Sequence, residues 1–194
     1  FGPARFYVRP AYDPEESACR QITRLGFDPK DVRHIVLTHF DADHVGGLAD
    51  FPWARIHLTA AEAFAALHPR GLTEKQRYLP GERDHHPVLV EHTPSASEAW
   101  RGFPGAKELT GIAAGIILIN LPGHSRGHAA VAVDAGERWI LHAGDSFYHH
   151  GQIDGTTKAP KGLRAMERLI AHDWAKVKAN HQRLTGLWAT AEPD

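Results

Sequence analysis

The chain has 194 residues, of which 42% are hydrophobic and 23% are charged, and these proportions are ordinary for a globular domain. Its 22 Lys and Arg side chains are balanced by 23 Asp and Glu, so no net positive charge is available to hold a nucleic acid or an anionic membrane. Cys19 is the only cysteine, which excludes an internal disulfide, whereas 15 histidines are many for this length.

These bulk properties predict a single domain over residues 1–194 that acts on a small molecule. The longest apolar run, 112–119, is too short to cross a bilayer, and the N-terminus lacks the pattern of a signal peptide. We therefore expect a cytoplasmic protein without a nucleic-acid or membrane partner. The sequence indicates no oligomeric state.

The N-terminal third of the chain predicts one helix and two strands. Asp13 followed by Pro14 is typical of a helix start, and Gly26 is typical of the end of that helix. The apolar, β-branched segments 34–38 and 55–58 are typical of short buried strands.

The middle of the chain carries weaker signals. Thr59 and Glu62 have the spacing of a capping box and predict a helix directly after the second strand. Residues 69–111 are rich in Pro, Gly, charge and His, and they indicate only a short helix over 74–78. Long irregular segments of this kind often form lids or binding loops, so we expect this one to shape a pocket.

Three strands and a helical segment are predicted in the C-terminal half. The strand segments are 115–120, 129–133 and 138–142. The segment 162–188 has helical periodicity, and its apolar stripe consists of Trp174, Val177, Leu184 and Trp188.

Metal-capable side chains follow three of the predicted strands. A loop after a buried strand is a place where a rigid backbone fixes polar groups in freely chosen directions. Imidazole and carboxylate together suit zinc, manganese or ferrous iron, and a set without thiolate argues against a closed structural zinc. The candidate ligands are His39, Asp41, Asp43, His44, His124 and Asp145.

The sequence motifs around these residues resemble those of the metallo-β-lactamase superfamily. The run Thr38-His-Phe-Asp-Ala-Asp-His-Val-Gly-Gly47 is similar to its signature loop, His-x-His-x-Asp-His. Segment 122–128, Pro-Gly-His-Ser-Arg-Gly-His, is similar to its third motif, and Ala143-Gly-Asp145 to its bridging aspartate. The resemblance, to the lactonase and glyoxalase-II branch, implies an α+β fold, the four-layer αββα sandwich, with one or two divalent ions at the sheet edges.

Carried over position by position, the resemblance implies two metal sites joined by Asp145. The first ion takes His39, Asp41 and His124, and the second takes Asp43 and His44. Zinc is the expected metal. Asp41, however, stands where the family usually has histidine, and its carboxylate favours a harder ion such as manganese or iron. The chain also lacks the family's terminal strands, so we expect both ends of the fold to be missing and a last histidine ligand to lie beyond Asp194.

The other candidate residues receive supporting roles. Tyr148 and His149 closely follow the bridging aspartate and are expected to line the substrate pocket. His128 and His142 are expected to pack near the ligands, while His181 lies on the stripe of a helix rather than at a strand end.

The resemblance implies a metal-dependent hydrolase that acts on a carboxylic ester, a lactone or a thioester. A metal-activated hydroxide would attack the carbonyl, and Asp43 would orient it and pass a proton to the leaving group. Two alternatives stay open: a glyoxalase-II-like thioesterase or a mono-iron dioxygenase, and a degenerate metal-binding scaffold without turnover.

Overall fold

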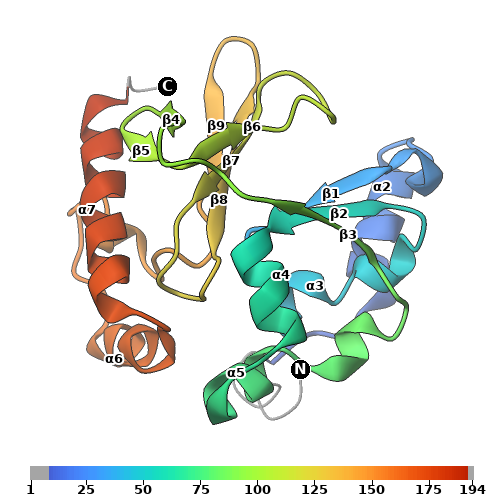
Figure 1. Cartoon of the computed structure of the whole chain (residues 1–194), viewed down its shortest axis with the longest axis horizontal. Coiled ribbons are helices and arrows are strands. Elements are labelled where there is room, and N and C mark those ends of the chain that lie inside the picture. Colours follow the sequence, from blue (N-terminus) through green and yellow to red (C-terminus); the bar gives the residue numbers. More distant parts are fainter. Residues whose placement is uncertain (1–8, 192–194) are drawn as a thin grey trace.

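Two β-sheets form the centre of the fold in the computed structural model, which describes residues 9–191 (Figure 1). The first eight and last three residues of the predicted domain lie outside the described part. The parallel sheet consists of β1 (His34–Val36), β2 (Arg55–Thr59) and β3 (Val88–His92), in that order. The antiparallel sheet consists of β6 (Ala106–Glu108), β7 (Ile116–Asn120), β8 (Ala129–Asp134) and β9 (Trp139–His142). A small hairpin pairs β4 (Ala99–Trp100) with β5 (Phe103–Pro104).

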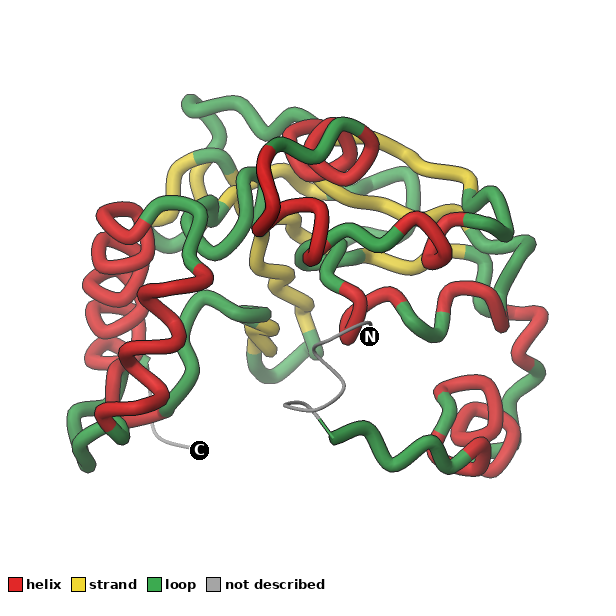
Figure 2. Tube along the Cα trace, turned by 90° about the horizontal axis from the view of Figure 1, so that it is seen from below, coloured by secondary structure: helices red, strands yellow, loops and turns green. Residues whose placement is uncertain are grey.

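Helices lie on both outer sides of the paired sheets. Those beside the parallel sheet are α2 (Ala18–Arg24), α3 (Ala42–Val45), α4 (Ala60–Leu67) and α5 (Gly71–Arg77). Those beside the antiparallel sheet are α6 (Lys161–Ile170) and α7 (Trp174–Thr190), and α7 lies at the opposite end of the molecule from α2 (Figure 2). Short 3-10 turns occur at Pro14–Glu16, Pro29–Asp31, Leu48–Asp50, Pro80–Arg83 and His150–Gln152. Among the described helices, none is both long and apolar enough to cross a membrane.

Among residues 9–191 the apolar core forms three clusters, and each joins two layers. The first packs α2 and α4 on the parallel sheet, with Ile56 and Leu58 at its centre. Another joins the two sheets, where Val36 of β1 meets Leu118 of β7. The third packs Leu184 of α7 on the antiparallel sheet. Helix, sheet, sheet and helix therefore follow one another, which confirms the predicted four-layer αββα fold.

Two predicted helices begin or break at positions that the sequence pattern did not indicate. Asp13 caps only a 3-10 turn, and the α-helix begins at Ala18 because Ser17 is extended and caps it. The segment 162–188 is two helices, since Ala171 is extended and the Asp173 carboxylate caps α7. The periodicity continues across the break, which is why the sequence pattern did not reveal it.

The apolar stripe expected on the C-terminal helix is only partly buried. Val177 and Leu184 are buried in α7, whereas Trp188 is 61% exposed. Leu184 therefore attaches the helix to the antiparallel sheet, and Val177 lies against the loop at Gly123.

The middle segment contains more structure than its sequence predicted. Strand β3 pairs in parallel with β2 along its whole length, although the segment is bordered by charge and histidine. Helix α5 covers Gly71–Arg77, three residues earlier than expected. The capping box is also incomplete: Thr59 accepts a hydrogen bond from the Glu62 backbone, but the Glu62 side chain turns into the core.

Candidate metal centre

Five of the six predicted ligands converge where the two sheets meet. The parallel sheet contributes the loop after β1 and helix α3, whereas the antiparallel sheet contributes the loop after β7 and the turn after β9. Two overlapping groups have ligand atoms within 4.8 Å of one another: His39, His44 and Asp145, and His39, Asp41 and His124. A backbone hydrogen bond from Ala129 to Thr38, 2.8 Å long, joins the two sheets beside them.

The distances within the cluster place both carboxylates among the imidazoles. Asp41 Oδ2 lies 3.0 Å from His124 Nε2 and 3.5 Å from His39 Nε2. Asp145 reaches two rings, with Oδ1 3.2 Å from His44 Nε2 and Oδ2 3.7 Å from His124 Nε2. Asp145 therefore lies between the two groups, the position expected of a bridging ligand.

His39 provides the clearest indication that this cluster fits a metal ion. Its ring is fully buried, and Nδ1 lies 3.0 Å from the hydroxyl of Thr38. Its other nitrogen, Nε2, has no hydrogen-bond partner among the described residues although it faces the carboxylates. A buried polar atom without a partner is costly, and coordination of a cation would satisfy it.

Asp43 is the sixth predicted ligand and lies at the edge of the cluster. Its side chain is 43% exposed, and Oδ2 is 3.7 Å from His44 Nε2. It belongs to neither of the two close groups among the described residues.

The charges of the cluster keep its carboxylates ionised. Burial opposes ionisation of Asp145, but the hydrogen bond from His44 and the neighbouring imidazoles outweigh it and hold the pKa of Asp145 well below its usual range. Burial likewise opposes the charged form of His44, yet the hydrogen bond and charge of Asp145 raise the pKa of His44. Negative charge therefore stays at the point where the ligand atoms converge.

The candidate ligands lie within a part of the chain that matches a known protein family. A family model described as the metallo-beta-lactamase superfamily matches residues 10–187, a range that contains all six predicted ligands. The chain belongs to the metallo-β-lactamase superfamily.

Two curated relatives with names that describe hydrolases are similar to this chain. A "probable metallo-hydrolase" of Mycobacterium tuberculosis is 51% identical over 193 residues, which are 100% of this chain and 62% of the relative. An N-acyl homoserine lactonase of Agrobacterium fabrum is 28% identical over 124 residues, 64% of this chain and 44% of the relative. The chain thus spans less than two thirds of the length of these curated relatives.

A solved structure shares the superfamily fold. It is an N-acyl homoserine lactone hydrolase with the product N-hexanoyl-L-homoserine bound at its catalytic metal centre. The TM-score is 0.60 at 23% identity, over 93% of this chain and 60% of the solved one. At this identity the likeness supports the fold alone.

Arg77, at the end of α5, is the residue of the centre that sequence reasoning missed. Its Nη1 atom donates to both carboxylate oxygens of Asp41, at 2.9 and 3.2 Å, and lies 2.6 Å from His124 Nε2. Its Nη2 atom donates to the carbonyl of Ile170. Asp41 occupies the N-cap position of α3 but makes no capping bond, so its carboxylate is free for these contacts.

The side chain of Glu62 links the loop that contains His39 to the loop that contains His124. Its fully buried carboxylate accepts hydrogen bonds from Phe40 N, beside His39, and from Ser125 Oγ, beside His124. It also accepts from Gly127 N and from the hydroxyl of Tyr78. At Gly127 an added Cβ would collide with the backbone of Glu62, so only glycine allows this approach.

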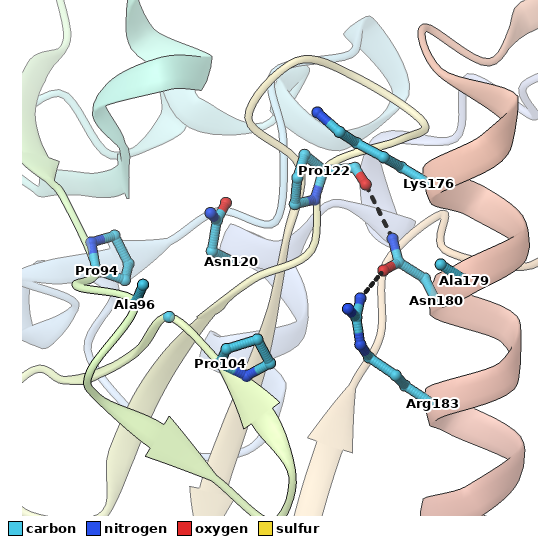
Figure 3. A pocket seen from close by; sticks show the side chains of 10 residues that line it. Pro94, Ala96, Pro104, Asn120, Pro122, Lys176, Ala179, Asn180 and Arg183 are labelled. Atoms are coloured by element: carbon cyan, nitrogen blue, oxygen red, sulfur yellow. Dashed lines mark hydrogen bonds between the residues drawn. The ribbon is translucent and has the colours of Figure 1, made fainter.

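Helix α7 fixes the His124 loop from the other side. The Asn180 amide donates to the carbonyl of Leu121. Figure 3 shows that it also donates to the carbonyl of Pro122 and that Arg183 in turn donates to Asn180. The groove in Figure 3, of about 320 Å³, lies between this helix, the loop at Pro94 and the end of β5 at Pro104. None of the ligand cluster lines this groove, which is therefore distinct from the candidate metal centre.

The other histidines considered in the sequence lie in different environments. His128 is fully buried; its Nε2 accepts from Asp145 N, and its Nδ1 lies 3.1 Å from the Leu121 carbonyl, which fits the packing role expected of it. His142 is exposed at the end of β9 rather than packed, although it lies near enough to the ligands for His44, after burial, to help lower the pKa of His142. His181 lies 3.0 Å from the buried carboxylate of Glu167 between α7 and α6, away from the ligands.

The two predicted pocket residues are placed differently. The hydroxyl of Tyr148 lies 3.3 Å from His124 Nδ1, directly beside the cluster. His149 instead accepts a hydrogen bond from Gly151 N and stacks on His150, and among the described contacts none joins it to the ligands. The structure therefore brings Tyr148 to the centre and leaves His149 in its own turn.

Proposed function

We propose that this chain is the metal-binding part of a hydrolase that cleaves a carboxylic ester, a lactone or a thioester. The observation that carries the proposal is the convergence of imidazoles and carboxylates on the partnerless Nε2 of His39. An open ligand set without thiolate is typical of catalytic zinc. The relatives named N-acyl homoserine lactonase make a lactone the first substrate to test, and the near balance of charge supports a small substrate.

The proposed ligands hold one or two divalent ions, zinc first and manganese or iron as alternatives. One ion would take His39, Asp41 and His124, and a second would take Asp43 and His44, with Asp145 between them. A bound divalent ion supplies Lewis acidity, because it lowers the pKa of water toward neutrality and polarises a carbonyl oxygen. The exposed carboxylate of Asp43 lies beside His44 and is suited to accept a proton there and to pass it to the leaving group.

Tyr148 is suited to hold the carbonyl oxygen of the substrate. Since His124 Nε2 accepts from Arg77, its proton is on Nδ1 and points at the Tyr148 oxygen. The hydroxyl proton of Tyr148 is then free to be donated to a substrate. Burial, followed by the charge of Asp145, raises the pKa of Tyr148, so the hydroxyl stays protonated as a donor.

A panel of lactones, aryl esters and thioesters tests this function with the full-length protein after metal loading. We expect turnover of the lactones, and we expect Tyr148→Phe to lower kcat by about 100-fold without changing metal content, as for loss of an oxyanion donor. Absence of turnover across the panel in metal-loaded protein would contradict the hydrolase proposal. Metal binding without any turnover would instead identify a scaffold.

A mono-iron dioxygenase is the second candidate, and one observation favours it. His39, Asp41 and His124 form a set of two imidazoles and one carboxylate, the ligand set of many non-haem iron oxygenases. Anaerobic loading with ferrous iron, followed by measurement of oxygen uptake with thiol and lactone substrates, separates the two. Oxygen uptake that depends on substrate would support the dioxygenase, and hydrolysis without uptake would exclude it.

A further inference from the structure

The guanidinium of Arg77 contacts one of the two groups of candidate ligand atoms and not the other. Arg77 reaches the group of His39, Asp41 and His124 with its Nη1 atom, and its side chain is only 7% exposed. No contact joins Arg77 to the other group's His44 or Asp145 among the described residues.

The hydrogen-bond roles at His124 show what the guanidinium does. His124 Nε2 and Asp41 Oδ2 are 3.0 Å apart, and Arg77 Nη1 is 2.6 Å from the first and 2.9 Å from the second. A proton on Nε2 would face the N–H donors of Arg77, so Nε2 is the unprotonated acceptor. Two acceptors this close repel each other unless a cation lies beside both. The guanidinium therefore neutralises the same pair of atoms that a metal ion would coordinate.

Arg77 also has room to leave this position. Arg77 itself lines a cavity of about 370 Å³, and Thr73, Glu74, Arg126 and His172 are among the other residues that line it. The acidic side chain in that cavity is Glu74, which already holds Arg126 through two 2.8 Å contacts. A guanidinium that gave up Asp41 would move toward this carboxylate rather than into an apolar wall.

Asp41 explains why an arginine is held here. A histidine at this position, as in the superfamily pattern, would present no fixed negative charge to Arg77. The carboxylate draws in a guanidinium through two N–H contacts, and ion pairs of this kind are the stronger hydrogen bonds of proteins. The departure from the family motif and the arginine are thus one feature of this chain.

We propose that Arg77 competes with metal for the group of His39, Asp41 and His124, so that the centre binds its two ions with unequal affinity. The first ion binds tightly to Asp43, His44 and Asp145, none of which the guanidinium contacts among the described residues. The second ion binds weakly because Arg77 must first be displaced from Asp41 and His124. This inference rests on the proposed metal centre but not on any particular substrate.

Stepwise metal binding tests the inference. The full-length protein is stripped with a chelator and titrated with Zn²⁺ and Co²⁺ by calorimetry, and the ions per chain are counted after equilibrium dialysis. For the wild type we expect a second dissociation constant at least about 10-fold weaker than the first. Arg77→Met should tighten the second step at least about 10-fold and leave the first unchanged, since it removes the competing cation.

Arg83→Met is the matched control. It removes another guanidinium of the same part of the chain, which donates to the Ala66 carbonyl and has no contact with Glu74 or with the ligand group among the described residues. Its two binding steps should equal those of the wild type. If Arg77→Met does not fold, as judged by its thermal melt without metal, Arg77→Gln replaces it, because glutamine keeps a donor for the Ile170 carbonyl without the charge.

Three outcomes would overturn the inference: equal affinities for both ions in the wild type, a second step that Arg77→Met leaves unchanged, or a second step that it weakens. The last would mean that the guanidinium supports the bound ion. A wild type that binds no ion at all would refute the metal centre itself, and with it the proposed function, which is a different result.

Discussion

Two groups of three histidines lie in this molecule, and their surroundings differ. One group, in the ligand cluster, is His39, His44 and His124. The other runs across the parallel sheet, one ring from each strand: His34, His57 and His92. In this row the rings contact each other, since His57 Nε2 lies 2.9 Å from His34 Nδ1 and its Nδ1 lies 2.9 Å from His92 Nε2.

The comparison shows what distinguishes a metal site from a histidine cluster. Both ring nitrogens of the central His57 are occupied by other imidazoles, and no close carboxylate is recorded at this row among the described residues. In the ligand cluster a buried nitrogen has no partner and two carboxylates contribute negative charge. Carboxylates and an unsatisfied nitrogen, rather than the number of histidines, are therefore the features that predict metal binding.

Among the changes that test this comparison, removal of the Asp145 carboxylate should have the largest effect. Asp145→Ala takes away the side chain that contacts both His44 and His124, so we expect metal affinity to fall at least about 100-fold and hydrolysis to be lost. Ions per chain after dialysis and turnover of the lactone and ester panel measure the two effects. Asp50→Ala, at an exposed aspartate in the 3-10 turn that follows α3, is the control. Unchanged metal content in Asp145→Ala would remove Asp145 from the centre.

The buried carboxylate under the ligand loops should have the largest effect on stability. Glu62→Ala leaves four donors without their acceptor, among them Phe40 N and Ser125 Oγ. We expect the free energy of unfolding to fall by about 3–5 kcal/mol, as for a broken buried network. Urea denaturation of metal-free protein measures it, with the exposed Glu137→Ala for comparison. A loss equal to that of the control would show that the network is dispensable.

The hydroxyl behind His39 should have a smaller effect on the metal. Thr38→Val keeps the shape of the side chain but removes the oxygen 3.0 Å from His39 Nδ1, so the ring loses the contact that orients it. We expect a fall of about 10-fold in metal affinity with little loss of stability. Calorimetric titration measures it against Thr73→Val, an exposed position on α5. Equal affinity in both variants would mean that packing alone orients His39.

The smallest expected effect concerns the row of His34, His57 and His92. This row should make the stability of the fold depend on pH, and it should not affect metal binding. Burial, together with His92 and His34, lowers the pKa of His57 from 6.5 to about 4, so the unfolded chain binds a proton that the folded chain resists. The stability due to neutral His57 is present above pH 6.5 and is lost as the pH falls toward 4.

His57→Gln should therefore flatten the decline of Tm between pH 6.5 and 4 and leave metal content unchanged. The exposed His86→Asn is a suitable control, because His86 has a positive φ of 52° that asparagine tolerates. A change in metal content in His57→Gln would contradict the distinction between the two histidine groups.

The sequence could point to the candidate ligands because they lie in short motifs that can be recognised without the rest of the chain. Each candidate ligand lies in the segment after a strand, and strand ends from two sheets meet at one edge, so short motifs such as His39 to His44 were sufficient to bring five of the six together. The fold followed from the same resemblance. Nothing in these motifs required knowledge of distant parts of the chain.

The residues that hold the ligands were missed for the opposite reason. Arg77 reaches Asp41 from 36 residues away, in a segment without clear periodicity, and Glu62 has the spacing of an ordinary helix cap. Strand β3 was missed because its Val-Leu-Val core is only three residues long and the chain around it is polar. Such contacts depend on how segments pack, which composition and spacing do not encode.

The division of the ligands between the two sheets has a consequence for how the molecule assembles. His39, Asp41 and His44 belong to the parallel half, whereas His124 and Asp145 belong to the antiparallel half. Neither half alone presents a complete set, so a metal ion bound by residues of both halves would bind only after the two sheets have packed together, and it would then link them. Removal of such an ion by a chelator should therefore weaken the interface between the sheets first, before either sheet unfolds.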